Sequence, residues 1–512
     1  MRRRPPALAI AFSEARILAP LWLAGLAAIA AATWMNAARP LPVEWLGWGF
    51  VAYALTPVAI GATAFGHDFS HRTMVLALSQ PVARTTLLTT RTAVVVIMVT
   101  ALAAGAALLV SNASRELPFD VTTALLVPAL AGICLAPALT LLTRSALAGL
   151  VFGIALPLFI LMAAELVAGM RYGFTPDVSM QARTLRDSIA LSGFYVMCAM
   201  ALPAIWYLSS RSEALEGPAR AAGLPHRAGL GRGARTHPAL ALVITELHLQ
   251  QGVLAFSVLA GCAIAPVVLL AGDALWLDAV VVPVVVLHGA LVALLAGALA
   301  SAEERQLGTI GWQVMLPFKA RWQWTIKAAV ASSVAVALGY GLPLALSVLV
   351  DSPELRRELR NSFDEQALFP LLGATTCALY VSTLVASGVR ALVTSLFAIA
   401  GAMLVLGPPA SWTSAWLGQM IGAGLARALP GPLTGGQLRT FLYLLQPVAA
   451  LMILSWLVLA LSFARQNHES ADRSARRVVR HVAWLFAAAV VGIALLEGSR
   501  DFLMAARAAL RS

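Results

Sequence analysis

The chain has 512 residues, of which 60% are hydrophobic and 12% are charged, and its mean hydropathy is +0.82. A soluble globular domain needs more polar surface than this, so the composition excludes that class and predicts an all-α polytopic membrane protein. The net charge of +12 does not require nucleic acid as a partner. The basic residues lie in loops between apolar segments, where the positive-inside rule accounts for them.

Apolar segments of about 20 residues, long enough to cross a bilayer as helices, recur along the chain. A first set of six is expected at 17–38, 45–66, 92–111, 121–143, 146–168 and 189–209. A second set is expected at 250–271, 279–300, 328–350, 367–387, 391–408 and 441–464. The pattern predicts two pseudo-symmetric six-helix halves, about 12 spans in all. The apolar run 482–496 is either a thirteenth span or an interfacial helix.

Lys and Arg gather in alternate loops, which places the N-terminus in the cytoplasm. The expected organisation is a first half at 1–209, a basic cytoplasmic linker at 210–238, a second half at 239–466, and a basic cytoplasmic segment with an apolar or amphipathic tail at 467–512. Mixed polar and apolar residues at 9–16 and 241–248 precede the first span of each half. Each of these segments is either an interfacial amphipathic helix or the cytoplasmic end of its span.

A polar segment follows the second span of each half, and we call these segments the first joint (67–91) and the second joint (301–327). An acid, a Thr, a Pro and a terminal base recur between them at one offset of 236 residues, as Asp68/Glu304, Thr73/Thr309, Pro81/Pro317 and Arg91/Lys327. An acid followed by helix-compatible residues and then Pro predicts a short helix with the acid in its first turn. Both joints are expected in the cytoplasm, accessible to another protein.

The joint sequences resemble those of the permease subunits of the type-2 ABC exporter family, most clearly in Glu304, Gly308, Thr309 and Pro317 of the second joint. The resemblance implies that the joints are coupling segments that contact an ATPase subunit. The candidate coupling residues are Asp68, Arg72, Thr73, Pro81, Arg84, Glu303, Glu304, Gly308, Thr309, Pro317, Lys319 and Arg321. The first joint departs from the pattern, with Asp68 in place of Glu and Arg72 in place of Gly, so its contact is expected to differ.

The same resemblance implies a transport subunit in the plasma (inner) membrane of a prokaryote, in contact with membrane lipid and with two copies of an ABC ATPase. The chain has no Gly-x-x-x-x-Gly-Lys-Ser/Thr phosphate loop, so we expect it to bind no cofactor, to be no enzyme itself, and to rely on ATP held by the partner. Its four cysteines lie in apolar stretches and predict neither disulfides nor a metal site.

Two ionisable residues, His288 and Glu165, are expected at membrane depth, where such groups are candidates for substrate contact or proton relay. Each is alternatively a side chain hydrogen-bonded between packed helices. The scarcity of such residues favours a permease driven by an external ATPase, moving a lipidic or amphipathic substrate. The alternative is an ion-coupled secondary transporter. An intramembrane enzyme would need a cluster of polar catalytic residues, which the sequence does not display.

Overall fold

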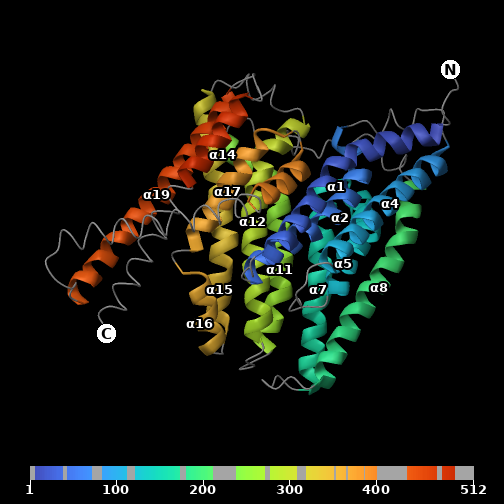
Figure 1. Ribbon diagram of the computed structural model, residues 1–512, viewed down its shortest axis with the longest axis horizontal. Coiled ribbons are helices and arrows are strands. Elements are labelled where there is room, and N and C mark those ends of the chain that lie inside the picture. Colours follow the sequence, from blue (N-terminus) through green and yellow to red (C-terminus); the bar gives the residue numbers. More distant parts are fainter. Residues whose placement is uncertain are drawn as a thin grey trace, which may run out of the picture.

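The computed structural model describes residues 6–38, 43–71, 83–111, 121–172, 180–210, 238–270, 277–307, 319–350, 353–364, 367–385, 387–399, 435–469 and 476–489. Every regular element in these ranges is a helix, as Figure 1 shows, which confirms the all-α prediction for the described part of the chain. Long apolar helices dominate, as expected of a membrane protein.

The described part of the first half contains six helical stretches, one of which includes a π-helical segment. They are α1 (Pro6–Ala38), α2 (Val43–His71), α4 (Arg84–Ser111), α5–η1–α6 (Val121–Leu130, Ala131–Leu135, Ala136–Thr143), α7 (Ala146–Tyr172) and α8 (Met180–Ser210). A left-handed Arg144 (φ 54°) separates α6 from α7, and the Ser145 hydroxyl accepts a hydrogen bond from the Ala148 N–H at 3.2 Å. The turn between these two helices is therefore closed locally.

The second half of the chain begins with α10 (Pro238–Leu249) and α11 (Gln251–Leu270). It continues with α12 (Leu277–Leu307), α14–η2–α15 (Ala320–Val334, Ala335–Gly341, Leu342–Leu349), α16 (Pro353–Ser362), α17 (Leu368–Ser382), Gly388–Ile399, α19 (Gly435–Glu469) and a helix at 476–489. Helix α16 is short and amphipathic, and was not expected. It packs Leu355 and Leu359 inward and lies at the lower end of Figure 1.

Nine helices among the described residues are long and apolar enough to cross a membrane, and α10 with α11, bent by 53°, make a tenth. The spans expected at 367–387 and 391–408 correspond to shorter helices, α17 and Gly388–Ile399, and residues 400–434 lie outside the described part of the chain. The segment at 9–16 is continuous with α1, as the end-of-span alternative predicts. Its counterpart at 241–248 is instead a separate helix, α10.

Helix boundaries around the two joints fall at the offset seen in the sequence. Helix α2 ends at His71 and α12 at Leu307, while α4 begins at Arg84 and α14 at Ala320. Each pair is separated by 236 residues. The correspondence therefore extends from the residues of the joints to the helices on either side of them.

Glycines at the same offset mark the closest approach of α2 and α12 to a neighbouring helix. A Cβ added to Gly61 would lie 1.9 Å from the carbonyl oxygen of Gly132 in η1, and one added to Gly297 would lie 2.3 Å from that of Thr375 in α17. No side chain fits at such distances. Both helices thus pack backbone to backbone, as small residues permit in membrane proteins.

The two π-helical segments each precede a proline at the same spacing. Pro137 and Pro343 are the second residues after η1 and η2. Proline lacks the N–H that would continue the i→i−4 ladder, and a local shift to wider hydrogen bonding accommodates that loss. The prolines therefore account for where α5–η1–α6 and α14–η2–α15 change their winding.

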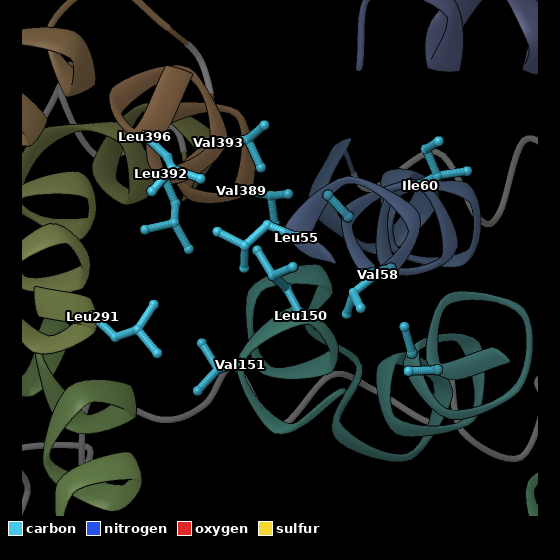
Figure 2. Close-up of a cluster of buried hydrophobic side chains, with 14 of the residues drawn as sticks. Leu55, Val58, Ile60, Leu150, Val151, Leu291, Val389, Leu392, Val393 and Leu396 are labelled. Atoms are coloured by element: carbon cyan, nitrogen blue, oxygen red, sulfur yellow. The ribbon is translucent and has the colours of Figure 1, made fainter. Parts of the chain in front are cut away.

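One hydrophobic core joins helices from the two parts of the chain (Figure 2). Leu55 of α2 and Leu150 of α7 face Leu291 of α12 and Leu392 of the Gly388–Ile399 helix, and all four are buried. Helices α7 and α11 also pack directly against each other. Helices of the two parts thus share one apolar core within the described part of the chain.

The helix at 476–489 runs back along α19. The Trp456 indole N–H donates to the Leu485 carbonyl at 3.1 Å, and the His481 ring stacks on Phe463 at 4.2 Å. Val479 and Trp484 point outward and are exposed. The apolar run 482–496 lies partly in this helix, and residues 490–496 lie outside the described part of the chain, so both alternatives for this run stay predictions.

We expect the close backbone approach at Gly132 to be essential for stability. Gly132→Ala would place its Cβ 2.3 Å from the Pro57 carbonyl oxygen, so overpacking should cost about 1–3 kcal/mol. Gly373→Ala is the matched control, because no atom lies within 4 Å of the added Cβ and Ala is the better helix former. Thermal unfolding of the full-length chain in detergent measures both. Equal melting temperatures for the two variants would contradict the packing.

Both joints are expected on the same side of the membrane, which predicts how single cysteines should be labelled. The native cysteines are replaced before each single cysteine is introduced. Cysteines at Ala83 and Lys319, exposed beside α4 and α14, should react with an impermeant reagent from one side of the membrane. Cysteines at Met180 and Arg357, exposed on α8 and α16, should react from the other side. Labelling of the two joints from opposite sides would indicate inverted repeats instead.

Candidate functional site

A lysine buried between two glutamates lies where the second joint meets the bundle. Lys327 of α14 forms ion pairs with Glu246 of α10, at 3.0 Å between Nζ and Oε1, and with Glu304 of α12. The three side chains are only 1–2% exposed. The cluster, which we call the Lys327 triad, therefore connects three helices through charge in the interior of the protein.

Burial makes the triad sensitive to the loss of any member. Moving one ion out of water costs several kcal/mol, which only closely placed opposite charges offset. Two acidic side chains surround one ammonium, so removing the lysine would leave the two acids buried beside each other without its positive charge. Glu304 and Lys327 also bound the second joint in the sequence, so the triad fixes its two ends next to each other and to α10.

A smaller version of the same contact occurs at the first joint. Arg91 of α4 forms an ion pair with Glu14 of α1, at 2.8 Å between Nε and Oε1, and these side chains are 12% and 9% exposed. Arg91 and Lys327 are the terminal bases of the two joints, while Glu14 and Glu246 lie in the segments that precede the first spans. In each half, the base that follows the joint is thus paired with an acid that precedes the first membrane helix.

Polar contacts continue from the Lys327 triad toward the C-terminal helices. The Arg305 guanidinium donates to the Thr383 carbonyl at the end of α17, and the Asn467 amide of α19 donates to the Thr383 hydroxyl at 3.5 Å. The rings of Trp324 and His468 lie 5.3 Å apart. The ends of α12, α14, α17 and α19 are therefore connected at the level of the second joint.

The position of the joint acids within their helices differs from the sequence prediction. Asp68 and Glu304 do not lie in the first turn of a short helix, because α2 and α12 continue through them and end three residues later. An acid in the last turn of a helix is disfavoured by the macrodipole, by about 0.3–1 kcal/mol. Lys327 offsets this at Glu304, whose burial suits an internal structural role better than direct contact with another protein.

The remaining joint candidates divide into three groups. Lys319 and Arg321 are exposed at the start of α14. Asp68 lies in α2, Arg84 in α4 and Glu303 in α12, and the structure describes the backbone alone at these three positions. The candidates outside the described residues are Arg72, Thr73, Pro81, Gly308, Thr309 and Pro317.

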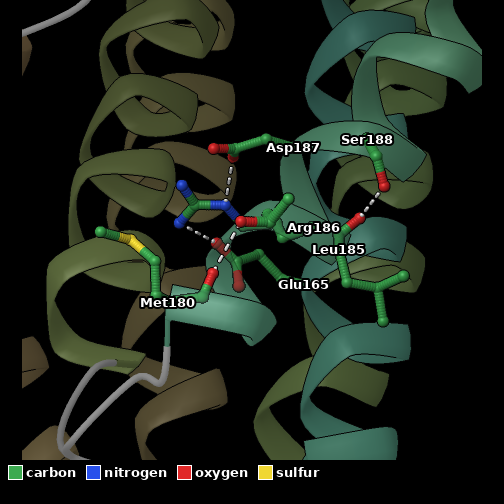
Figure 3. A network of polar contacts seen from close by, with 7 residues as sticks. Glu165, Met180, Leu185, Arg186, Asp187 and Ser188 are labelled. Atoms are coloured by element: carbon green, nitrogen blue, oxygen red, sulfur yellow. Dashed lines mark hydrogen bonds and ion pairs between the residues drawn. The ribbon is translucent and has the colours of Figure 1, made fainter.

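Glu165 is held between two packed helices, as the second of its two interpretations predicts. Figure 3 shows Arg186 of α8 reaching Glu165 of α7, with Nη1 3.0 Å from Oε1, and Asp187, with Nε 2.7 Å from Oδ1. Asp187 is exposed, whereas Glu165 is buried. Charge neutralisation by Arg186 explains how a carboxylate is accommodated at this depth.

His288 is buried in α12 and stacks on Phe256 of α11, with ring centroids 5.4 Å apart. Neither ring nitrogen meets hydrogen-bond geometry with a described group, although the backbone of Leu338 in η2 lies beside the ring. His288 is therefore a buried side chain between packed helices with the Leu338 backbone beside its ring, and its role in ligand contact stays a prediction.

We predict that Lys327→Met destabilises the full-length chain by about 3–5 kcal/mol, because two buried carboxylates lose their counter-ion. Arg91→Met should cost less, since water reaches this more exposed pair. Adding Glu246→Gln and Glu304→Gln to Lys327→Met should restore part of the loss by removing the uncompensated charges. Thermal unfolding in detergent measures the series, and a Lys327→Met variant as stable as the wild type would refute the triad as an ionic contact.

Comparisons with known proteins add no assignment to these residues. No protein-family model matches the chain, and neither a curated protein nor a solved structure shows significant similarity to it. Any function is therefore inferred from the geometry of the described residues and from the sequence pattern of the joints.

Proposed function

We propose that this chain is the membrane permease of an ATP-driven exporter of the ABC type. Two six-helix halves in one chain would each present a joint to one copy of a separate ATPase on the cytoplasmic side. ATP binding and hydrolysis on that partner would move the joints and switch the bundle between inward-facing and outward-facing states. The membrane is the inner (plasma) membrane of a prokaryote in this proposal.

The observation that carries the proposal is the repeated acid–base contact at the joints. Arg91 pairs with Glu14 and Lys327 with Glu246, so each joint is attached to the segment that leads into the first helix of its half. A force applied at a joint would be transmitted to that helix through an ion pair as well as along the chain. Two such connections at equivalent positions suit a protein that is driven at two points from outside the bilayer.

Exposed charge at the second joint supplies a surface for the partner. Lys319 and Arg321 lie on the first turn of α14, outside the buried triad. Charged groups at the rim of an interface mainly guide association and fix register. We assign these two bases to contact with the ATPase, and Glu304 to positioning the joint that carries them.

The scarcity of isolated charge within the described spans supports an external energy source. Glu165 is paired with Arg186, so it is not a free carboxylate on an ion path. An ion-coupled carrier normally has several such groups. One observation bears on that alternative: His288 is an ionisable side chain buried in α12, beside the backbone of Leu338. Transport that depends on a proton gradient and is lost in His288→Phe, but needs no ATP, would select the carrier.

The test of the proposal is co-expression with the soluble Walker-motif ATPase that it requires, sought first in the adjacent reading frame. The chain alone should hydrolyse no ATP, and the complex should contain one permease and two ATPases. Lys319→Glu with Arg321→Glu should weaken capture of the ATPase at least about tenfold, corresponding to ~1.4 kcal/mol. The matched control, Arg357→Glu with Arg360→Glu on exposed positions of α16 at the opposite end, should leave capture unchanged. Normal capture by the joint variant, or ATP hydrolysis by the chain alone, would refute the proposal.

A further inference from the structure

A cavity lies where α7 meets the bend between α10 and α11. Its volume is about 220 Å³, and helix α12 closes its inner side. Helices α10 and α11 meet at 53° on either side of Gln250. The side-chain amide of Gln250 donates to the Ala296 carbonyl at 3.0 Å. In the first half, α1 runs unbroken from Pro6 to Ala38. The bend belongs to the second half of the chain.

The walls and the rim of this cavity differ in chemistry. Val151, Val253, Leu295 and Leu299 form buried apolar walls, with Phe152 beside them. Apolar walls of this kind favour contact with apolar groups. The interior is therefore suited to hydrocarbon.

The polar residues that line the cavity lie at the ends of the helices that form it. Ser145 lies at the start of α7, while His248 and Gln251 flank the bend and are hydrogen-bonded to each other. Both flanking residues are exposed. This arrangement suits an amphiphile whose polar head stays at the surface while its chain enters.

The cavity opens toward the lipid. Gly252, which lines it, is exposed, and no atom lies within 4 Å of a Cβ added there. Leu259 lies two turns further along the same face of α11 and is 45% exposed. Leu254 and Val258 of this helix are also exposed. The mouth is thus continuous with a lipid-facing surface of α11.

We infer that this cavity binds one hydrocarbon chain of a membrane amphiphile, taken from the leaflet next to the joints, with its polar head at Ser145, His248 and Gln251. The volume is below the roughly 300–1,000 Å³ of sites for drug-sized ligands, so the cavity takes part of a single chain. The inference rests on the proposed function in one respect, because it identifies the bound molecule with the transported substrate. The substrate class is then an acyl-bearing amphiphile that reaches the bundle through the bend in the second half.

Gly252 offers a direct test, because a larger side chain at this position would occupy the cavity and its Cβ would clash with no neighbouring atom. The full-length chain is placed in phosphatidylcholine nanodiscs with a lysophosphatidylglycerol that carries a photoreactive diazirine on its acyl chain. After illumination, mass spectrometry maps the labelled peptides. In the wild type, we expect labelling concentrated in 145–152 and 251–259. Gly252→Leu should reduce this labelling at least about fivefold, and Gly252→Ala should reduce it less.

Gly373→Leu is the matched control, because Gly373 in α17 also has no atom within 4 Å of an added Cβ and lies away from the cavity. It should label as the wild type does. Unchanged labelling in Gly252→Leu, or equal labelling of all exposed apolar faces, would overturn the inference. Rapid reaction of Gly252→Cys with a hydrophilic maleimide, unaffected by added lysolipid, would show a water-filled mouth and overturn it as well.

The outcome for the cavity is separable from the outcome for the transporter class, because the labelling needs neither ATPase nor transport. Specific labelling by a chain that captures no ATPase would support the binding site and refute the ABC proposal. Capture of the ATPase without specific labelling would do the reverse.

Discussion

The burial of one ammonium group between two carboxylates determines how the second half is held together at its joint. Lys327 is 1% exposed, and its two partners come from α10 and α12. Such a cluster is stable only while all three charges stay in contact, since each alone would be a costly buried ion. The ends of the joint and the helix leading into α11 are therefore constrained to move together.

The two joints are alike in plan and unequal in detail. At the first joint, Arg91 and Glu14 are more exposed, and α1 continues without a break into its span. At the second joint, α10 is a separate helix, and the bend at Gln250 lies on the path from the triad to the cavity beside α7. In the proposed transporter, movement at the second joint would therefore alter the packing of the bundle at this bend. Movement at the first joint would be carried by a continuous helix.

Close backbone contacts and ion pairs hold different regions of this bundle together. Apolar side chains gain little from leaving lipid for a protein interior, so helices in a membrane associate through close packing and polar contacts. Gly61 and Gly297 bring α2 and α12 against their neighbours deep in the bundle. The ion pairs act near the joints, between α1 and α4 in the first half and among α10, α12 and α14 in the second, where the exposed Lys319 and Arg321 also lie.

The sequence alone determined the helical membrane class, because apolar length and loop charge are local properties of the chain. It also located both joints, the offset between them and most of the long helices, and it singled out Glu165 and His288. It did not reveal that Glu14 and Glu246 pair with the terminal bases, although both acids stand at similar places before the first spans. Nor did it show that Glu304 lies in the last turn of a long helix. Only the tertiary structure decided these points, since an ion pair between residues about 80 positions apart depends on how helices pack. The cavity beside Gly252 likewise depends on the angle between α10 and α11, which no local pattern specifies.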